Sequence, residues 1–318
     1  MRSTLLSLLF LSIFVAIPLF SQPQLFRLDD SHSLAGFNVK YMKLVNVEGR
    51  FTFMRGAFLI DTSDVTKSSF SVLLKSESIN TANEGRDEDL KGESFFETAK
   101  YPMVSFQSKK IEKQGDGYVA TGMFVMHGVT KEITLPFTFL GNTVDQRGTV
   151  RVGFESHSKL SRSTYSVNGS KMSVDDEVQL NLTALATKPN LDSLRLMGFG
   201  GKKNIAAVMN ETMKSKSIKD AIEQYKSLKA AQDTTYNLGA DQLNLLTRFL
   251  ADKGKTKEAV EVAKTSVEAN PTDTQQYFML GYAYQKDGQK DLARDQYKKA
   301  LELDVFNASA MEMLRWVE

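Results

Sequence analysis

Hydrophobic and polar residues alternate along the first half of the chain. Between residues 25 and 186 the apolar positions recur with a period of two, in short runs separated by turn clusters such as Gly115-Asp116-Gly117. This alternation is typical of strands buried on one face. The apolar faces are Phe37, Val39 and Tyr41; Phe51 and Phe53; Phe70, Val72 and Leu74; Ile133, Leu135, Phe137 and Phe139; Val150, Val152 and Phe154; and Val178, Leu180 and Leu182. Many short antiparallel strands predict a barrel or a sandwich, and the bulky aromatics favour a closed all-β barrel with an apolar interior.

After a glycine-rich linker predicted at residues 188–203, the pattern becomes helical and repeats every 34 residues. Leu243, Leu246, Leu250, Ala259 and Pro271 recur as Tyr277, Leu280, Tyr284, Ala293 and Val305. This period, with small residues where two helices cross, resembles tetratricopeptide repeats. An earlier partial copy contains Ala221 and Tyr225, and residues 307–316 are expected to form a closing helix. We therefore predict an all-α repeat domain over residues 204–318, with an unrelated bundle of helical hairpins as the alternative.

The predicted barrel domain, residues 22–187, follows an apolar N-terminal segment. A short positive start precedes an apolar run from Leu5 to Phe20 that ends at Ser21, which describes a secretory signal peptide over residues 1–21. We expect cleavage after Ser21 and export, most simply to the periplasm. The alternative is an uncleaved anchor, because the run is close to the ~20 residues that span a bilayer.

Composition narrows the possible functions. Hydrophobic residues make up 42% of the chain and charged residues 25%, which is an ordinary globular balance. The net charge is only +2, so we expect no nucleic-acid partner, because phosphate binding needs a concentrated positive surface. The chain has no Cys and only three His, and it has no phosphate loop, nucleophile elbow or HExxH motif. We therefore expect no metal, no cofactor and no enzymatic activity.

Motifs along the barrel region occur in the order found in one known family. They are Leu28-Asp29-Asp30-Ser31-His32-Ser33, Phe37-Asn38-Val39-Lys40, Val47-Glu48-Gly49-Arg50-Phe51, Ser78-Ile79-Asn80-Thr81, Arg86-Asp87-Glu88-Asp89-Leu90, Ser94-Phe95-Phe96, Tyr101-Pro102, Phe106-Gln107-Ser108, Gly128-Val129-Thr130-Lys131, Leu160-Ser161-Arg162-Ser163-Thr164-Tyr165 and Asp176-Glu177-Val178. With them, residues 25–186 resemble the YceI-like family of polyisoprenoid-binding barrels. The resemblance implies a lipocalin-like barrel around a long isoprenoid or similar lipid, export to the periplasm, and no established catalytic activity. The family usually has His where Asp89 and Tyr41 stand, so another head group is expected if those His take part in binding.

A site for a lipid tail needs no motif and would look like an unusually aromatic core. Burial of each CH₂ is worth about 0.8 kcal/mol, so roughly ten to twenty buried carbons suffice for micromolar binding. The chain has 20 Phe and 10 Tyr against one Trp. The candidate ligand-binding side chains are Phe37, Val39, Tyr41, Phe51, Phe53, Phe95, Phe96 and Phe106. The alternative is that the rings simply fill the barrel.

Arg86 is the charged candidate, because it lies in a turn-rich segment before Phe95. A guanidinium at a cavity mouth would hold a phosphate or a quinone oxygen. Pairing of Arg86 with Asp87 or Asp89 is the structural alternative, since the guanidinium matches a carboxylate equally well. The three His do not form a site by spacing, and His32 is expected to hydrogen-bond within a turn.

Two functions follow from these patterns. The first is an exported lipid-binding protein whose barrel holds an isoprenoid-type lipid or a quinone-like amphiphile, while its helical repeats dock a protein partner. The second is an envelope interaction scaffold whose barrel is filled and purely structural. A lipid-modifying enzyme has support only from Arg86, Asp87, Asp89 and His32, and the catalytic motifs are missing.

Overall fold

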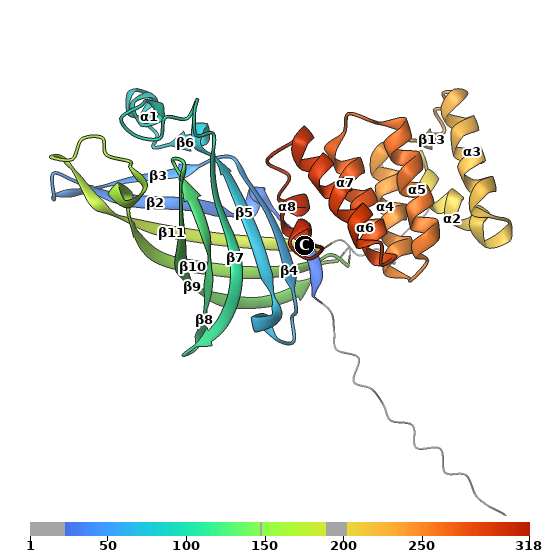
Figure 1. Ribbon diagram of the computed structural model, residues 1–318, viewed down its shortest axis with the longest axis horizontal. Helices are drawn as coiled ribbons and strands as arrows, with labels where there is room; N and C mark the ends of the chain where they lie inside the picture. The colour runs from blue at the N-terminus through green and yellow to red at the C-terminus, as the bar shows by residue number, and fades with distance from the viewer. Residues whose placement is uncertain (1–22, 147, 189–201) are drawn as a thin grey trace, which may run out of the picture.

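The computed structural model describes residues 23–146, 148–188 and 202–318. The predicted signal peptide and nearly all of the predicted linker lie outside the described residues. In the rest of the chain a β-barrel is followed by an array of helices (Figure 1). The predicted order, an all-β antiparallel barrel followed by all-α tetratricopeptide-type repeats, is confirmed.

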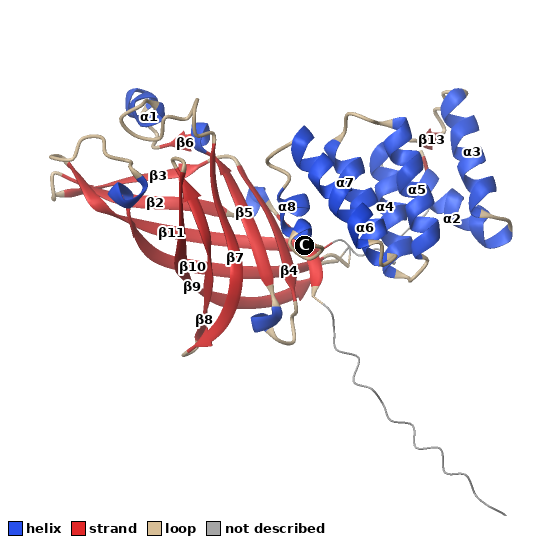
Figure 2. Ribbon diagram, in the orientation of Figure 1, coloured by secondary structure: helices blue, strands red, loops and turns tan. Residues whose placement is uncertain are grey.

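The barrel consists of long strands that wrap around one interior (Figure 2). The strands are β1 (Gln24–Leu28), β2 (Leu34–Tyr41), β3 (Val45–Phe51), β4 (Met54–Ile60), β5 (Ser69–Lys75), β6 (Ile79–Asn80), β7 (Met103–Gln114), β8 (Gly117–Met126), β9 (Val129–Val144), β10 (Val150–Ser161) and β11 (Val174–Lys188). Eight of them form the ring β1-β4-β5-β7-β8-β9-β10-β11, which the antiparallel pairing of β1 with β11 closes. Closure removes free sheet edges, and the alternating side chains give the barrel an apolar interior.

At two positions around the barrel, two short strands in succession take the place of one long strand. β1 and β2 both pair with β11, as Arg27 opposite Thr187 and Phe37 opposite Leu180 show. β3 and β4 are the two parts of the next wall, because β3 pairs with β2 and β4 pairs with β1. The barrel therefore has a base, where β1 and β4 lie, and a mouth, where β2 and β3 extend beyond it.

The break between β3 and β4 reverses the direction of one predicted side chain. β3 ends at Phe51 and β4 begins at Met54, and between them the Phe53 amide donates to the Ser78 hydroxyl, at 3.0 Å. The Phe53 ring packs outside the barrel against Phe306, with ring centroids 5.5 Å apart. The expectation that Phe51 and Phe53 share the inner face is therefore wrong, because the bend interrupts the alternation.

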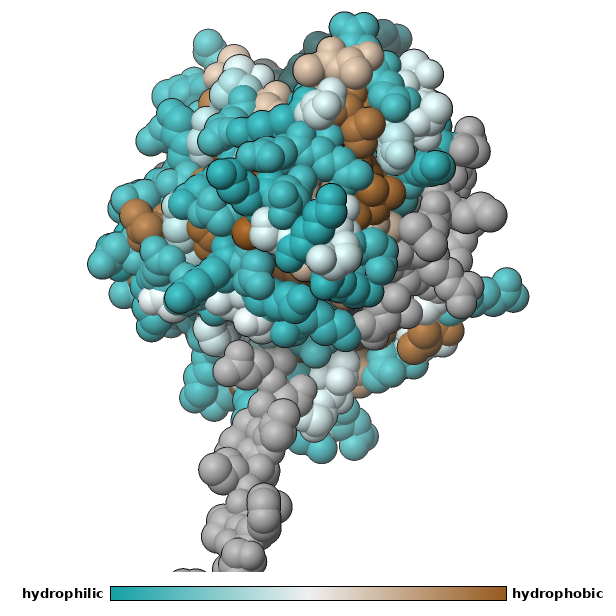
Figure 3. Space-filling model, turned by 90° about the vertical axis from the view of Figure 1, so that its right-hand side faces the viewer, coloured by the Kyte–Doolittle hydropathy of each residue, from teal (hydrophilic) through white to brown (hydrophobic). Residues whose placement is uncertain are grey.

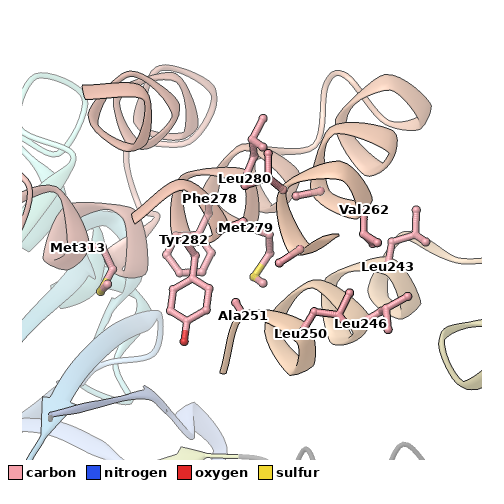
Figure 4. Close-up of a cluster of buried hydrophobic side chains, with 14 of the residues drawn as sticks. Leu243, Leu246, Leu250, Ala251, Val262, Phe278, Met279, Leu280, Tyr282 and Met313 are labelled. Carbon is pink, nitrogen blue, oxygen red and sulfur yellow. The ribbon is translucent and has the colours of Figure 1, made fainter. Parts of the chain in front are cut away.

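The helical array is built from successive antiparallel helix pairs. Its helices are α2 (Ile205–Ser215), α3 (Ile218–Ala230), α4 (Ala240–Asp252), α5 (Thr256–Ala269), α6 (Thr274–Lys286), α7 (Lys290–Leu303) and α8 (Ala308–Leu314), with a small β12–β13 pair (Lys203–Asn204 and Tyr236–Asn237) beside them. Leu243, Leu246 and Leu250 from α4 lie in one core with Phe278 and Met279 from α6 (Figure 4). A Cβ at Gly281 would lie 2.6 Å from the Tyr297 ring, so the close crossing of α6 and α7 requires glycine there.

The array packs against the outside of the barrel at its base end. α8 lies against β4 and β5, and Leu25, Ala57 and Leu73 of the barrel belong to the same buried cluster as the helix cores (Figure 1). The Glu312 carboxylate is fully buried there and accepts hydrogen bonds from the Ser69 and Ser71 hydroxyls, each at 2.5 Å. Because buried carboxylates need such donors, this contact fixes the seat of the last helix on the barrel wall.

Candidate functional site

The barrel encloses an apolar cavity of about 230 Å³. Its wall is formed by the inward positions of the strands, so the period-two pattern of the sequence becomes the lining. Pockets for drug-sized ligands span roughly 300–1,000 Å³, so this one suits a slender ligand. The charged residues in the described lining are Glu155 and Arg162, and the remaining wall is almost entirely hydrophobic.

Aromatic rings occupy the base of the interior. The Phe58 ring stacks on Phe70 and on Phe154, with centroids 5.6 and 5.8 Å apart. Phe137 approaches Phe70 and Phe154 edge-on at 6.2 and 6.0 Å. Offset and edge-on contacts of this kind stabilise beyond the buried area alone. These rings form the aromatic wall of the cavity at the base.

The mouth is bordered by two irregular segments. The segment after α1 (Glu84–Lys91) brings Phe95 and Phe96 into the lining, where Phe96 meets the Phe51 ring edge-on at 5.8 Å. Opposite it, the 3₁₀ turn η4 (Arg162–Tyr165) leads into the loop of residues 166–173. A Cβ at Gly169 would lie 2.4 Å from the Phe95 ring, so the two segments touch across the opening.

Six of the nine predicted ligand-binding residues line the cavity. They are Phe37, Val39, Phe51, Phe95, Phe96 and Phe106. The other three lie elsewhere, and Phe53 packs outside the wall as described above. Tyr41 lies at the end of β2 beyond the mouth and is exposed. Arg86 hydrogen-bonds to Thr81 near its own helix.

Arg86 binds Thr81 instead of facing the cavity. Its Nε donates to the Thr81 hydroxyl at 2.7 Å and its Nη2 donates to the Thr81 carbonyl at 3.0 Å. The Asp87 carboxylate accepts from the same hydroxyl at 2.6 Å and from the Thr81 amide at 2.8 Å. The expected partners were a ligand oxygen or the carboxylates of Asp87 and Asp89, but the guanidinium fastens α1 through Thr81.

Arg162 is the buried charge that sequence reasoning missed. Its guanidinium donates to the carbonyls of Val167, Gly169, Val174 and Asp175, at 2.8 to 2.9 Å. Burial lowers the pKa of Arg162, and the nearby Asp176 carboxylate opposes this shift. The signal was present, because Arg162 lies in one of the ordered family motifs, but a motif does not reveal that its partners are backbone carbonyls.

One polar group in the lining has no partner among the described residues. The Ser156 hydroxyl is buried and makes no hydrogen bond there. An unsatisfied buried hydroxyl costs roughly 1–3 kcal/mol, so a ligand oxygen beside it would be favoured. The cavity is therefore apolar, with one hydroxyl able to hydrogen-bond to an oxygen.

The three His remain apart. His32 bonds to Asp29 at 3.0 Å within its turn, His157 to Asn181 and Glu155, and His127 lies against the Tyr101 ring.

No cluster of three or more His, Asp or Glu able to hold a metal is found in the described ranges. None of the helices in those ranges combines the length and hydrophobicity needed to cross a membrane.

The barrel covers the side of the array that α4, α6 and α8 share. Arg248 of α4 donates to the Leu25 carbonyl at 2.8 Å, and the Arg27 guanidinium lies 5.6 Å from the Phe278 ring of α6. In the same region Tyr282 donates to the Asp252 carboxylate, and burial, followed by the charge of Asp252, raises the pKa of Tyr282. This side already has an occupant within the chain.

Comparison with known proteins agrees with this architecture. A family model described as YceI-like domain matches residues 26–186, and a tetratricopeptide repeat model matches residues 275–304. A protein of Yersinia pestis named UPF0312 protein is 29% identical over 155 residues, which are 49% of this chain and 81% of the relative.

Solved structures are also similar to part of this chain. The Campylobacter jejuni YCEI protein is 29% identical with a TM-score of 0.44, covering 51% of this chain and 96% of that one. A polyisoprenoid binding domain from Saccharophagus degradans, implicated in plant cell wall breakdown, is 16% identical with a TM-score of 0.39, covering 52% of this chain and 98% of that one. Because the family match takes in half of the sequence and nearly all of the described barrel, this chain belongs to the YceI-like family, with tetratricopeptide repeats joined behind its barrel.

Proposed function

We propose that this protein is an exported lipid-binding protein whose barrel holds the tail of an isoprenoid or a similar amphiphile. The observation that carries the proposal is the apolar cavity inside the barrel, lined by aromatic and aliphatic side chains. Family membership and the apolar N-terminal segment of residues 1–21 support the lipid and the export, respectively. The periplasm is the destination that we propose.

The cavity volume sets the length of tail that the barrel holds without rearrangement. At about 30 Å³ for each water-sized group, 230 Å³ accommodates on the order of eight methylene-sized groups. Their burial is worth about 6 kcal/mol, which corresponds to a Kd of tens of micromolar before ordering costs. A long isoprenoid therefore needs part of its tail outside the mouth or movement of the base rings. A ligand oxygen beside Ser156 would accept a hydrogen bond from its hydroxyl.

Filling the cavity tests the proposal. Val178 lines the cavity, and its neighbour Gln179 lies on the opposite, exposed face of β11. We expect native mass spectrometry of protein purified from a bacterial host to show one lipid adduct, which Val178→Trp reduces about ten-fold or more and Gln179→Trp leaves unchanged. Thermal unfolding should stay near that of the wild type in both. Apo mass alone in the wild type, or equal loading of the two variants, would argue for a structural barrel.

We also propose that the helical array docks a protein partner away from the side shared by α4, α6 and α8. The supporting observation is that the barrel covers that side, so a partner there would have to displace buried Glu312 and Tyr282. Photo-crosslinking in cells from the exposed positions Glu268 of α5 and Lys298 of α7 should trap a partner, whereas Ser71 should crosslink only to the array. Absence of a partner at both outer positions would count against this docking role.

A further inference from the structure

The hairpin at the barrel mouth exposes an unusual number of large apolar side chains. Tyr41, Met42, Leu44 and Val45 are all exposed, Leu44 by 80%. Beside them, in the loop after η4, Met172 is completely exposed, and the two segments are joined by a hydrogen bond of 2.6 Å from the Met42 amide to the Ser173 carbonyl. We call residues 41–45 and 168–173 the mouth tip. It lies at the end of the barrel farthest from the helical array (Figure 1).

The apolar surface of the mouth tip is continuous with the cavity. Val39 lines the cavity, and Tyr41 is the next residue on the same face of β2. Val174, which also lines the cavity, pairs directly with Tyr41. An apolar strip therefore runs from the interior over the edge of the mouth to the tip.

The tip is also positively charged. Lys43 and Lys171 of the tip and the adjacent Lys40 are exposed, and none of them forms an ion pair with another described residue. Three acidic residues follow the tip on β11: Asp175 is partly buried, Asp176 accepts from Ser161 and Ser163, and Glu177 pairs with Lys159 at 2.7 Å. Apolar side chains interspersed with lysines suit an anionic, partly hydrocarbon surface.

The hairpin holds these side chains in a turn that does not favour them. Met42 and Lys43 have φ values of 52° and 60°. Two consecutive positive φ angles are the pattern of a type I′ turn, in which Asn-Gly is preferred and other side chains cost of order 1 kcal/mol or more each. On the other side of the tip, Arg162 fixes the loop through carbonyls on both sides of Met172. Strain and bracing of this kind are typical of functional positions.

We propose that the mouth tip docks the protein on an anionic lipid bilayer, with Met42, Leu44 and Met172 inserted and the lysines at the head groups. The face of the molecule seen from its helical end is largely hydrophilic, with an apolar band and several smaller apolar patches (Figure 3). Docking places the cavity mouth against the membrane. The proposal goes beyond lipid storage, since docking is measurable whether or not the cavity is loaded.

The first experiment is sedimentation of the exported protein, purified as cells process it, with phosphatidylglycerol and with phosphatidylcholine vesicles. Leu44→Ser/Met172→Ser is expected to weaken binding to phosphatidylglycerol by about 100-fold, because two large apolar side chains lose their burial. The matched control is Leu140→Ser/Val144→Ser, which removes two exposed apolar side chains at the base end of β9 and should leave binding unchanged. Phosphatidylcholine should bind at least ten-fold more weakly than phosphatidylglycerol.

A turn variant separates docking from folding. Met42→Asn/Lys43→Gly gives the hairpin the residues that its φ angles favour, so it should unfold at the same or a higher temperature than the wild type. It nevertheless removes one inserted side chain and one charge, and we expect at least ten-fold weaker vesicle binding. Wild-type binding by this well-folded variant would overturn the proposal.

A fluorescent probe reports insertion independently of any other membrane contact of the chain. The protein has no cysteine, so Met172→Cys and, as the control, Leu140→Cys each carry a single polarity-sensitive label. Phosphatidylglycerol vesicles should shift the emission of the label at 172 to shorter wavelength and leave that at 140 unchanged. Equal responses at the two positions, no response at 172, or equal binding to both lipids would refute docking through the tip.

Discussion

The two ends of the barrel interior have similar residues and different packing. At the base, the buried Phe58 ring stacks on Phe70 and on Phe154, with centroids 5.6 and 5.8 Å apart. At the mouth, the partly buried rings of Phe37, Phe51 and Phe96 are tilted or perpendicular, with centroids 5.8 to 6.1 Å apart. Rings from both ends line the same cavity, which teaches that the number of rings alone does not determine whether a barrel is hollow.

The largest expected effect is the difference in the free energy of unfolding when one ring is removed from each end of the barrel. Phe58→Ala should lower the free energy of unfolding by about 3–5 kcal/mol, because the packed base cannot collapse around the lost ring. Phe37→Ala should cost less than about 2 kcal/mol, since that ring is only partly buried. Denaturant unfolding of the two variants measures the difference, and equal losses would show that both ends are packed alike.

The mouth depends on Arg162 for its shape, so its replacement should have the next largest effect. Arg162→Gln leaves several buried carbonyls without donors and should cost about 2–3 kcal/mol. Arg151, near the base, pairs with Asp29 and Asp145 at 3.3 and 3.1 Å while partly exposed, so Arg151→Gln should cost about 1 kcal/mol or less. Hydrogen exchange should accelerate in residues 166–173 only in the first variant. Faster exchange there in both variants would contradict a local role of Arg162.

Asp176 provides a smaller, pH-dependent contribution at the same mouth. Hydrogen bonds from Ser161 and then Ser163 lower the pKa of its carboxyl group. A lowered pKa in the folded state means that the stabilisation is complete above the ordinary carboxyl range and is lost as the pH falls through the folded-state value. Asp176→Asn should cost less than about 1 kcal/mol at pH 7, and its difference from the wild type should shrink toward pH 3. A difference that grows on acidification would contradict this sign.

Much of the fold could be predicted from the sequence, because period-two and 34-residue patterns directly reflect burial. The barrel, the repeats and the closing helix α8 are all local consequences of these patterns. Six of the nine candidate residues lie in the cavity lining for the same reason, and their role in binding stays a prediction. The prediction for Phe53 was wrong because the alternation continues in the sequence through the bend between β3 and β4, where the Phe53 amide donates to Ser78.

Individual side-chain contacts, both local and between distant residues, could not be predicted from the sequence. Arg86 and Asp87 meet at Thr81 because of the local path of the chain, and neither charge pattern nor spacing singles out a threonine. The Glu312 contact joins residues 243 positions apart, and a lone Glu in a short terminal helix reads as a solvated charge. Whether aromatic rings fill a barrel depends on the register of its strands, and the amino-acid composition does not determine that register.

The seat of α8 on the barrel has a consequence for the order in which the chain matures. β1 is synthesised well before β11, on which it closes, and the outer wall of β4 and β5 waits for Glu312 of α8, which is synthesised after the whole barrel. Contacts this far apart in sequence form late and slowly. A product terminated before α8 would therefore present a barrel with uncovered Ser69, Ser71 and Leu73, a mark by which quality-control proteases would recognise it.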